Sequence, residues 1–111
     1  MPDPTRLYDQ AIRLKDNGKL DAAVAKLHES LDADPRYALA HAAMSVVLQK
    51  QGKHDEAVAH ARKVCELEPN DAFSYTAMSV TCQRAYAGTG DQGYIQMAED
   101  AMAKSHALGG S

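Results

Sequence analysis

The chain has 111 residues, which is the length of a single domain. Its formal net charge is −3, with 12 Lys and Arg against 15 Asp and Glu, so it lacks the positive charge on which a dedicated nucleic-acid or anionic-membrane binder depends. Twenty residues are Ala, whereas only six are Val and two are Ile, a balance that favours helices and excludes a sheet protein. We therefore expect an all-α domain whose partner is a protein or a small molecule.

The start of the chain is polar and contains Pro2 and Pro4, without the basic segment and apolar run of a secretory signal. The apolar stretch 38–48 is interrupted by His41 and Ser45 and is much shorter than the ~20 residues that a membrane span needs. The sequence therefore predicts a cytoplasmic protein without membrane insertion.

Helix signals recur along the whole chain. Asp3 before Pro4, and Asp71 shortly after Pro69, supply the acceptor side chain that the start of a helix prefers. Glycines mark the turns between helices. Together with the repeat described next, these signals predict six helices, at 4–17, 20–34, 37–51, 54–67, 71–86 and 93–108.

The chain repeats itself at an offset of 34 residues. The identical pairs are Leu14 and Leu48, Gly18 and Gly52, Lys19 and Lys53, Asp21 and Asp55, Ala23 and Ala57, Val24 and Val58, and Pro35 and Pro69. The same offset aligns 43–49 with 77–83, where five of seven residues are identical. Three similar helix pairs therefore follow one another.

A period of 34 residues, with Gly at the turn between helices, small residues on the second helix and Pro at the end of the unit, resembles the tetratricopeptide repeat family. The resemblance implies a right-handed α-α superhelix of three helix pairs in a single domain spanning 1–111, with units at about 4–37, 38–71 and 72–108. The sequence departs from the family at two positions of each unit. The usual Trp is Leu7, His41 or Tyr75, and the usual Gly at the helix crossing is Ala11, Ser45 or Ser79.

The third unit contains extra residues between its two helices. Its second helix matches that of the second unit only if Ala98 corresponds to Ala57, an offset of 41, so seven residues are inserted near 87–93. Three of them are Gly, and we expect the insertion to form a mobile loop.

The two ends of the repeat array are polar where the inner units are apolar. The face that meets the preceding unit carries Met44 and Val47 in the second unit, but Arg6, Gln10 and Arg13 in the first. The face that meets the following unit carries Glu99, Ala103 and His106 in the third. Terminal repeats need polar outer faces, so we expect a complete three-repeat protein with both ends capped.

The remaining face of each first helix is expected to line the concave surface as a peptide-binding groove. The first and second units contribute Tyr8, Ile12, Lys15, Leu39, Ala42, Val46, Gln49 and Lys50, and the third contributes Phe73, Thr76, Val80, Gln83 and Arg84; Thr5 lies on the same face. An exposed apolar groove is typical of a surface that receives a peptide or an amphipathic helix. The alternative is that a tightly closed solenoid buries Val46 and Val80.

The sequence therefore predicts a noncatalytic interaction or adaptor module whose partner is another protein or peptide segment, with self-association through the same groove as an alternative. The family's best-known function, binding chaperone C-terminal carboxylates with Lys and Asn side chains, is argued against. The corresponding positions are Tyr8, Ile12, Ala43, Phe73 and Ala77, without a cation or an amide.

No pattern predicts a cofactor, a metal site or a catalytic site. His54 and His60 point to opposed sides of one helix, and 88–91 lacks the Gly-Lys-Ser/Thr of a phosphate loop. Cys65 and Cys82 are expected to be about 13 Å apart, too far for a disulfide, and therefore reduced. A small-molecule or metal-dependent enzyme is the less favoured alternative. Lys15, Lys50 and Arg84 form either a basic rim for ligands or charges that complement helix ends.

Overall fold

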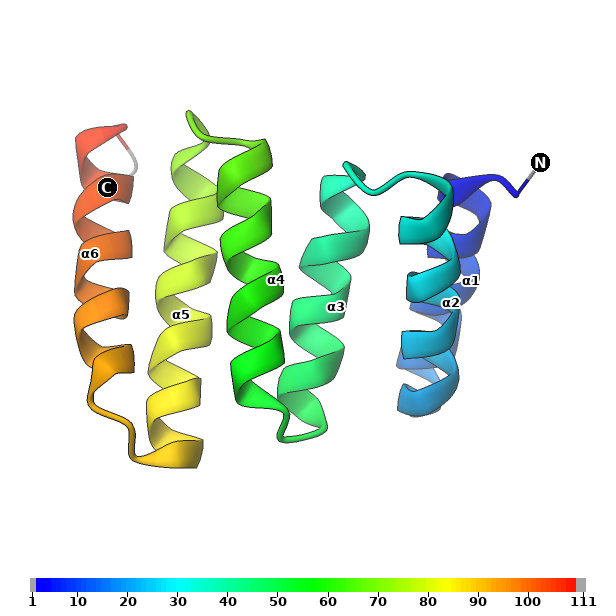
Figure 1. Ribbon diagram of the computed structural model, residues 1–111, viewed down its shortest axis with the longest axis horizontal. Helices are drawn as coiled ribbons and strands as arrows, with labels where there is room; N and C mark the ends of the chain where they lie inside the picture. The colour runs from blue at the N-terminus through cyan, green and yellow to red at the C-terminus, as the bar shows by residue number, and fades with distance from the viewer. Residues whose placement is uncertain (1, 110–111) are drawn as a thin grey trace.

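A computed structural model describes residues 2–109, and these residues form six helices without a strand. They are α1 (Pro4–Asp16), α2 (Leu20–Ala33), α3 (Ala38–Lys50), α4 (His54–Leu67), α5 (Ala72–Thr89) and α6 (Gly93–Ala107). The helices form three antiparallel pairs, arranged in one row from α1 and α2 at one end to α6 at the other (Figure 1). The prediction of an all-α solenoid of three helix pairs is confirmed. Within the described range, every helix is too short or too polar to cross a membrane.

Local side-chain chemistry explains where the helices begin and turn. The carboxylate of Asp3 accepts a hydrogen bond from the Thr5 backbone N–H at 3.0 Å, and Asp71 caps α5 in the same way at the Phe73 N–H. Gly18 and Gly52, which occupy equivalent positions of two units, adopt φ angles of 77° and 78° at the turns after α1 and α3. The repeat in sequence is therefore a repeat in backbone conformation.

Small residues allow the two helices of each pair to cross closely. Ala11 and Ala23 are buried where α1 crosses α2, and Ser45 and Ala57 are buried in the second pair. In the third pair, the buried hydroxyl of Ser79 donates a hydrogen bond of 2.8 Å to the backbone carbonyl of Ala98. Serine thus serves at a crossing where its one polar group is satisfied by the facing helix.

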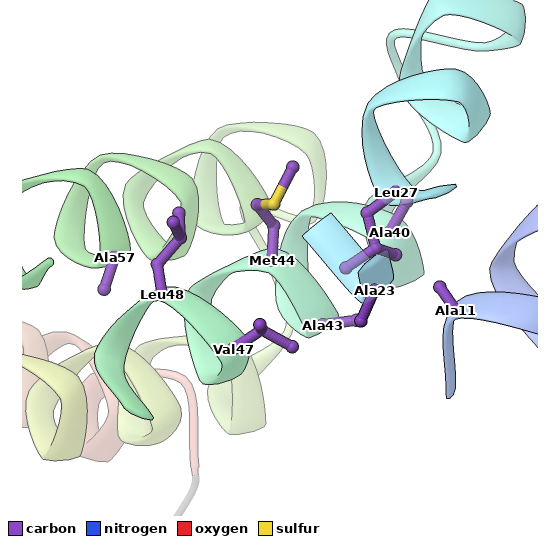
Figure 2. Packing of buried hydrophobic residues seen from close by; sticks show 9 residues of the cluster. All are labelled: Ala11, Ala23, Leu27, Ala40, Ala43, Met44, Val47, Leu48 and Ala57. Atoms are coloured by element: carbon purple, nitrogen blue, oxygen red, sulfur yellow. The ribbon is translucent and has the colours of Figure 1, made fainter. Parts of the chain in front are cut away.

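The interior consists of two hydrophobic clusters that meet on α4. The first cluster extends from Ala11 on α1 to Ala57 on α4, and it includes the fully buried side chains of Leu27, Met44 and Val47 (Figure 2). The second cluster contains Val58, Cys82, Ala85, Tyr94 and Ala98, which come from α4, α5 and α6. Adjacent residues of α4, Ala57 and Val58, therefore belong to different clusters.

The outer faces of the row are polar, as the sequence predicts. Arg6 and Arg13 are exposed on α1, and Glu99 and His106 are exposed on α6. The inner residues at positions equivalent to the two arginines, Ala40 and Val47, are fully buried.

The prediction of a loop at 87–93 is wrong for its first half. Helix α5 continues through Ala87 and Gly88 to Thr89, whose hydroxyl donates to the Ala85 carbonyl at 2.7 Å. The helix stops at Gly90, which has a φ of 74°, a left-handed conformation that Gly adopts without strain. Asp91 then accepts a hydrogen bond from the Gly93 N–H at the start of α6. Three of the seven residues therefore lie on α5, only residues 90–92 connect the two helices, and Gly93 begins α6.

Gly88 lies in a close contact between helices and not in a flexible turn. A Cβ atom at this position would overlap the imidazole of His54 at the start of α4. The glycine that the sequence assigns to a loop thus lies on a helix that passes directly over a side chain of another helix.

Candidate functional site

Large apolar side chains are exposed on α3 and α5, on the face that the sequence assigns to the groove. The exposed fractions are 53% for Leu39, 43% for Val46, 76% for Phe73 and 40% for Val80. Val46 and Val80 are therefore exposed and are not buried in a closed core. Val46 differs sharply from its neighbour Val47, which is fully buried.

Helix α1 contributes less to this open face than α3 and α5 do. Tyr8 and Ile12 are half-buried and pack against the first cluster. The ring of Tyr8 lies edge-on to that of Tyr37, with centroids 5.7 Å apart, and burial is the main cause of its raised pKa. The unit-one residues of the predicted groove therefore belong partly to the interior, whereas Thr5 is exposed.

An apolar cavity of about 260 Å³ lies between α3, α4 and α5. Three predicted groove residues line it, namely Ala42, Val46 and Phe73. The other lining residues are Ser45, Ala61, Val64, Ser74, Ala77, Met78 and Thr81. Ala61 and Val64 lie outside the predicted groove, which consists of first helices alone, whereas the second helix α4 lies between α3 and α5 and forms part of the wall. The small side chains of Ala61 and Ala77 were the sequence feature that could have indicated a cavity between these helices.

Polar groups at the cavity are mostly satisfied by their own helix. The hydroxyl of Thr81 donates to the Ala77 carbonyl at 3.0 Å, and that of Ser74 donates to the carboxylate of Asp71 at 3.0 Å. The cavity therefore offers apolar contact and few free hydrogen-bonding groups.

Two predicted groove residues face elsewhere. The hydroxyl of Thr76 is 2.6 Å from the Ser105 hydroxyl, so this side chain turns towards α6. Gln83 lines a second cavity of about 360 Å³ between α5 and α6, together with Tyr86, Ile95 and Met102. The sequence does not predict this second cavity, at which the apolar side chains of Tyr86 and Ile95 are exposed.

The predicted basic rim separates into two kinds of cation. Lys15 lies in the last turn of α1 and pairs with Asp16 at 3.6 Å, and Lys50 lies in the last turn of α3. Arg84 is exposed and is not at a helix end, because α5 continues to Thr89. Complementing the helix dipole, an effect confined to the last turn, therefore explains Lys15 and Lys50 but not Arg84. Gln49 is half-buried beside this rim.

Two of the histidines, His41 and His60, form a partly buried pair that the sequence did not reveal. The Nδ1 atoms of His41 and His60 are 3.0 Å apart, and Nε2 of His41 lies 2.9 Å from the Pro35 carbonyl oxygen. Burial, followed by the charge of His41, lowers the pKa of His60. The expectation that His41 is a packed interior residue is confirmed. Within residues 2–109, no three His, Cys, Asp or Glu side chains come together as metal ligands.

Both cysteines are buried free thiols, as predicted. The Sγ of Cys65 donates to the Ser74 carbonyl at 3.4 Å. Burial raises the pKa of the Cys65 thiol to about 11 and raises that of Cys82 as well.

The fold and the open apolar face define a helical-repeat protein built from stacked helix pairs. A tetratricopeptide repeat family model matches residues 14–78, more than half of the chain, and the chain therefore belongs to the tetratricopeptide repeat family. No curated protein matches the sequence.

Solved structures resemble this chain over nearly its whole length. A crystal structure of MamA has a TM-score of 0.81 at 20% identity, covering 96% of this chain and 58% of MamA. MamA from Desulfovibrio magneticus RS-1, from residue 41 to its end, has a TM-score of 0.75 at 27% identity, covering 96% of this chain and 56% of that one. The chain thus spans a little over half the length of these MamA structures.

A third similar structure is the second tetratricopeptide repeat domain of Spaghetti (RPAP3), solved with the HSP90 peptide SRMEEVD bound. Its TM-score is 0.75 at 17% identity, covering 96% of this chain and 92% of that one. At this identity the similarity concerns the fold.

Proposed function

We propose that this chain is a noncatalytic protein-interaction module that binds a short apolar or amphipathic segment in a groove over α3, α4 and α5. The observation that carries the proposal is the apolar cavity beside Val46 and Phe73, two large side chains that remain exposed. Burying one leucine-sized side chain there would contribute about 1.5–3 kcal/mol, enough for a ligand anchor.

The similar fold of the second RPAP3 domain, solved with a peptide bound, supports a peptide as the kind of ligand. The mode of binding proposed here is apolar. Ala43, Phe73 and Ala77 occupy positions where a carboxylate-binding relative would have cations or amides, so a chaperone tail of that kind is not the proposed ligand. The net charge of −3 argues against a nucleic acid, and the two free thiols suit a reducing compartment such as the cytoplasm.

A peptide-display selection tests this function directly. A random library is selected on the wild-type chain, and the recovered peptides are measured on wild type and on Val46→Glu. Burying the introduced carboxylate beneath a ligand is costly, so peptides that occupy the groove should bind the variant at least tenfold more weakly.

Ile95→Glu is the matched control, because Ile95 is exposed to a similar extent but lies at the second cavity, between α5 and α6. Peptides that lose affinity for this variant and not for Val46→Glu would place the binding site at the second cavity. Failure to recover any peptide whose binding depends on Val46 would contradict the proposed function.

A further inference from the structure

The residues that the sequence assigns to the groove carry a net positive charge, although the chain as a whole is acidic. These thirteen predicted residues include Lys15, Lys50 and Arg84 but no Asp or Glu, in a chain with 15 acidic and 12 basic residues. The apolar cavity itself is lined by uncharged residues, so a charged part of a ligand would be recognised by cations outside it.

Lys50 and Arg84 occupy equivalent positions of the second and third units, 34 residues apart. Both are exposed, and within residues 2–109 neither forms an ion pair, whereas Lys15 is paired with Asp16. Because α5 extends beyond Arg84, this arginine has no role at a helix end. Two cations thus remain available to a ligand on neighbouring first helices.

The two cations have a fixed position relative to the apolar part of the groove. Lys50 follows Val46 by four residues on α3, and Arg84 follows Val80 by four residues on α5. Four helical residues correspond to about 6 Å along the axis and return to nearly the same face. A ligand that places an apolar side chain beside Val46 therefore has its next turn beside the cations.

We propose that the occupant of the groove is an acidic amphipathic segment of another protein. An apolar side chain of this segment enters the cavity between α3, α4 and α5, and carboxylates about one helical turn away meet Lys50 and Arg84. This inference rests on the proposed function and specifies its ligand. Charge complementarity also favours this orientation, since the carboxylate of Asp71, which holds the Ser74 hydroxyl at the cavity, lies at the start of α5 and would repel an acidic group placed there.

The test repeats the display selection on Lys50→Glu/Arg84→Glu and on a control, Lys26→Glu/Lys63→Glu. The control makes the same change in net charge at lysines of α2 and α4 that pair with Glu29 and Glu66, outside the proposed site. Wild type and control should recover peptides with acidic residues about one turn from an apolar anchor. The double charge reversal should recover basic residues at that place.

One recovered acidic peptide then gives the magnitude. Its affinity, measured by fluorescence anisotropy, should fall on the order of twofold to fivefold with each of Lys50→Gln and Arg84→Gln, and the difference should shrink as salt is added. Amidation of its C-terminus should leave the affinity unchanged, since the ligand is an internal segment.

Three results would overturn the inference. Val46-dependent peptides without an acidic bias, unaffected by the charge reversal, would leave the proposed function standing and exclude an acidic ligand. Loss of affinity on amidation would indicate a chain terminus as the ligand. A dimer in sedimentation that Val46→Glu dissociates would make a second copy the occupant. If no peptide depends on Val46, the proposed function itself fails.

Discussion

The imidazole rings of His41 and His60 meet through their Nδ1 atoms, 3.0 Å apart, and join α3 to α4. The Pro35 carbonyl can only accept a hydrogen bond, so Nε2 of His41 donates to it and Nδ1 of a neutral His41 accepts from Nδ1–H of His60. This chain of hydrogen bonds has one consistent arrangement when both rings are neutral. A proton added to each ring would leave two N–H groups facing each other.

The stability of the domain should therefore depend on pH through His60. Its pKa is lowered in the folded state, mainly by burial and then by His41 and His28, with Glu56 opposing the shift. The unfolded chain then binds a proton more readily, so the stabilising contribution is fully present above about pH 6.5 and is lost as the pH falls below it. Melting temperatures measured from about pH 7.5 to about pH 5 should decline accordingly.

His60→Asn separates this pair from other titrating groups. The Asn amide N–H can donate to His41 in place of Nδ1–H but does not titrate, so the decline towards low pH should become shallower. His106→Asn, at an exposed histidine of α6, should leave the slope unchanged. A slope equally steep in His60→Asn would contradict the assignment.

Val46 and Val47 should respond in opposite ways to the same substitution. Val46→Glu introduces a carboxylate that stays hydrated, and its free energy of unfolding should change by no more than about 0.5 kcal/mol. Val47→Glu buries an unpaired charge in the first cluster and should cost several kcal/mol or prevent folding. Urea denaturation of both variants checks this, and a large loss in Val46→Glu would mean that Val46 is an interior residue after all.

The effect of Gly88→Ala should reverse sign with the residue at position 54. In the wild-type chain the new Cβ meets the His54 imidazole, and the variant should be destabilised. In a His54→Ala background the obstacle is gone, and the same substitution should stabilise α5 by about 0.5–1 kcal/mol because Ala is the better helix former. A double-mutant cycle by chemical denaturation measures the coupling. Equal effects in the two backgrounds would rule out the contact.

Cys65 and Cys82 should react slowly with thiol reagents while the domain is folded. Both are buried, and a pKa of about 11 leaves little thiolate at Cys65 near neutral pH. Labelling by a chromogenic disulfide reagent should be slow in buffer and fast in denaturant. Rapid labelling of either thiol in buffer would show that its surroundings open readily.

The 34-residue repeat was sufficient to predict the helices, because each unit carries its own turn glycine and crossing residues. The repeat also predicted which face of α3 is buried, because Met44 and Val47 are apolar at positions where the first unit, at the end of the array, is polar. What the pattern could not provide was any contact between residues with no counterpart in the other units. The pairing of His41 with His60 and the packing of Gly88 on His54 are both of this kind.

The sequence predicts a loop at 87–93 because three glycines so close together are typical of a turn, and this prediction is wrong for residues 87–89. Gly90 does end a helix, but Gly88 is inside one, where a lack of side chain permits close packing. The sequence predicts a groove on the first helices α1, α3 and α5, and the structure has an apolar cavity at α3, α4 and α5. The depth of the cavity was not predictable, because it depends on how closely α4 packs between α3 and α5, which residue spacing does not determine.

The position of Ala57 and Val58 on α4 bears on how the domain unfolds. Repeat proteins can lose their units one at a time, because each unit contacts only its neighbours. Here neighbouring residues of one rigid helix belong to the two hydrophobic clusters, so melting α4 removes support from both at once. The hydroxyl of Tyr94 also donates a hydrogen bond to Asp55 in the first turn of α4 and so ties α6 to the same helix. The array should therefore behave as one cooperative unit with its weak points at the outermost helices, and fraying should reach the middle helices last.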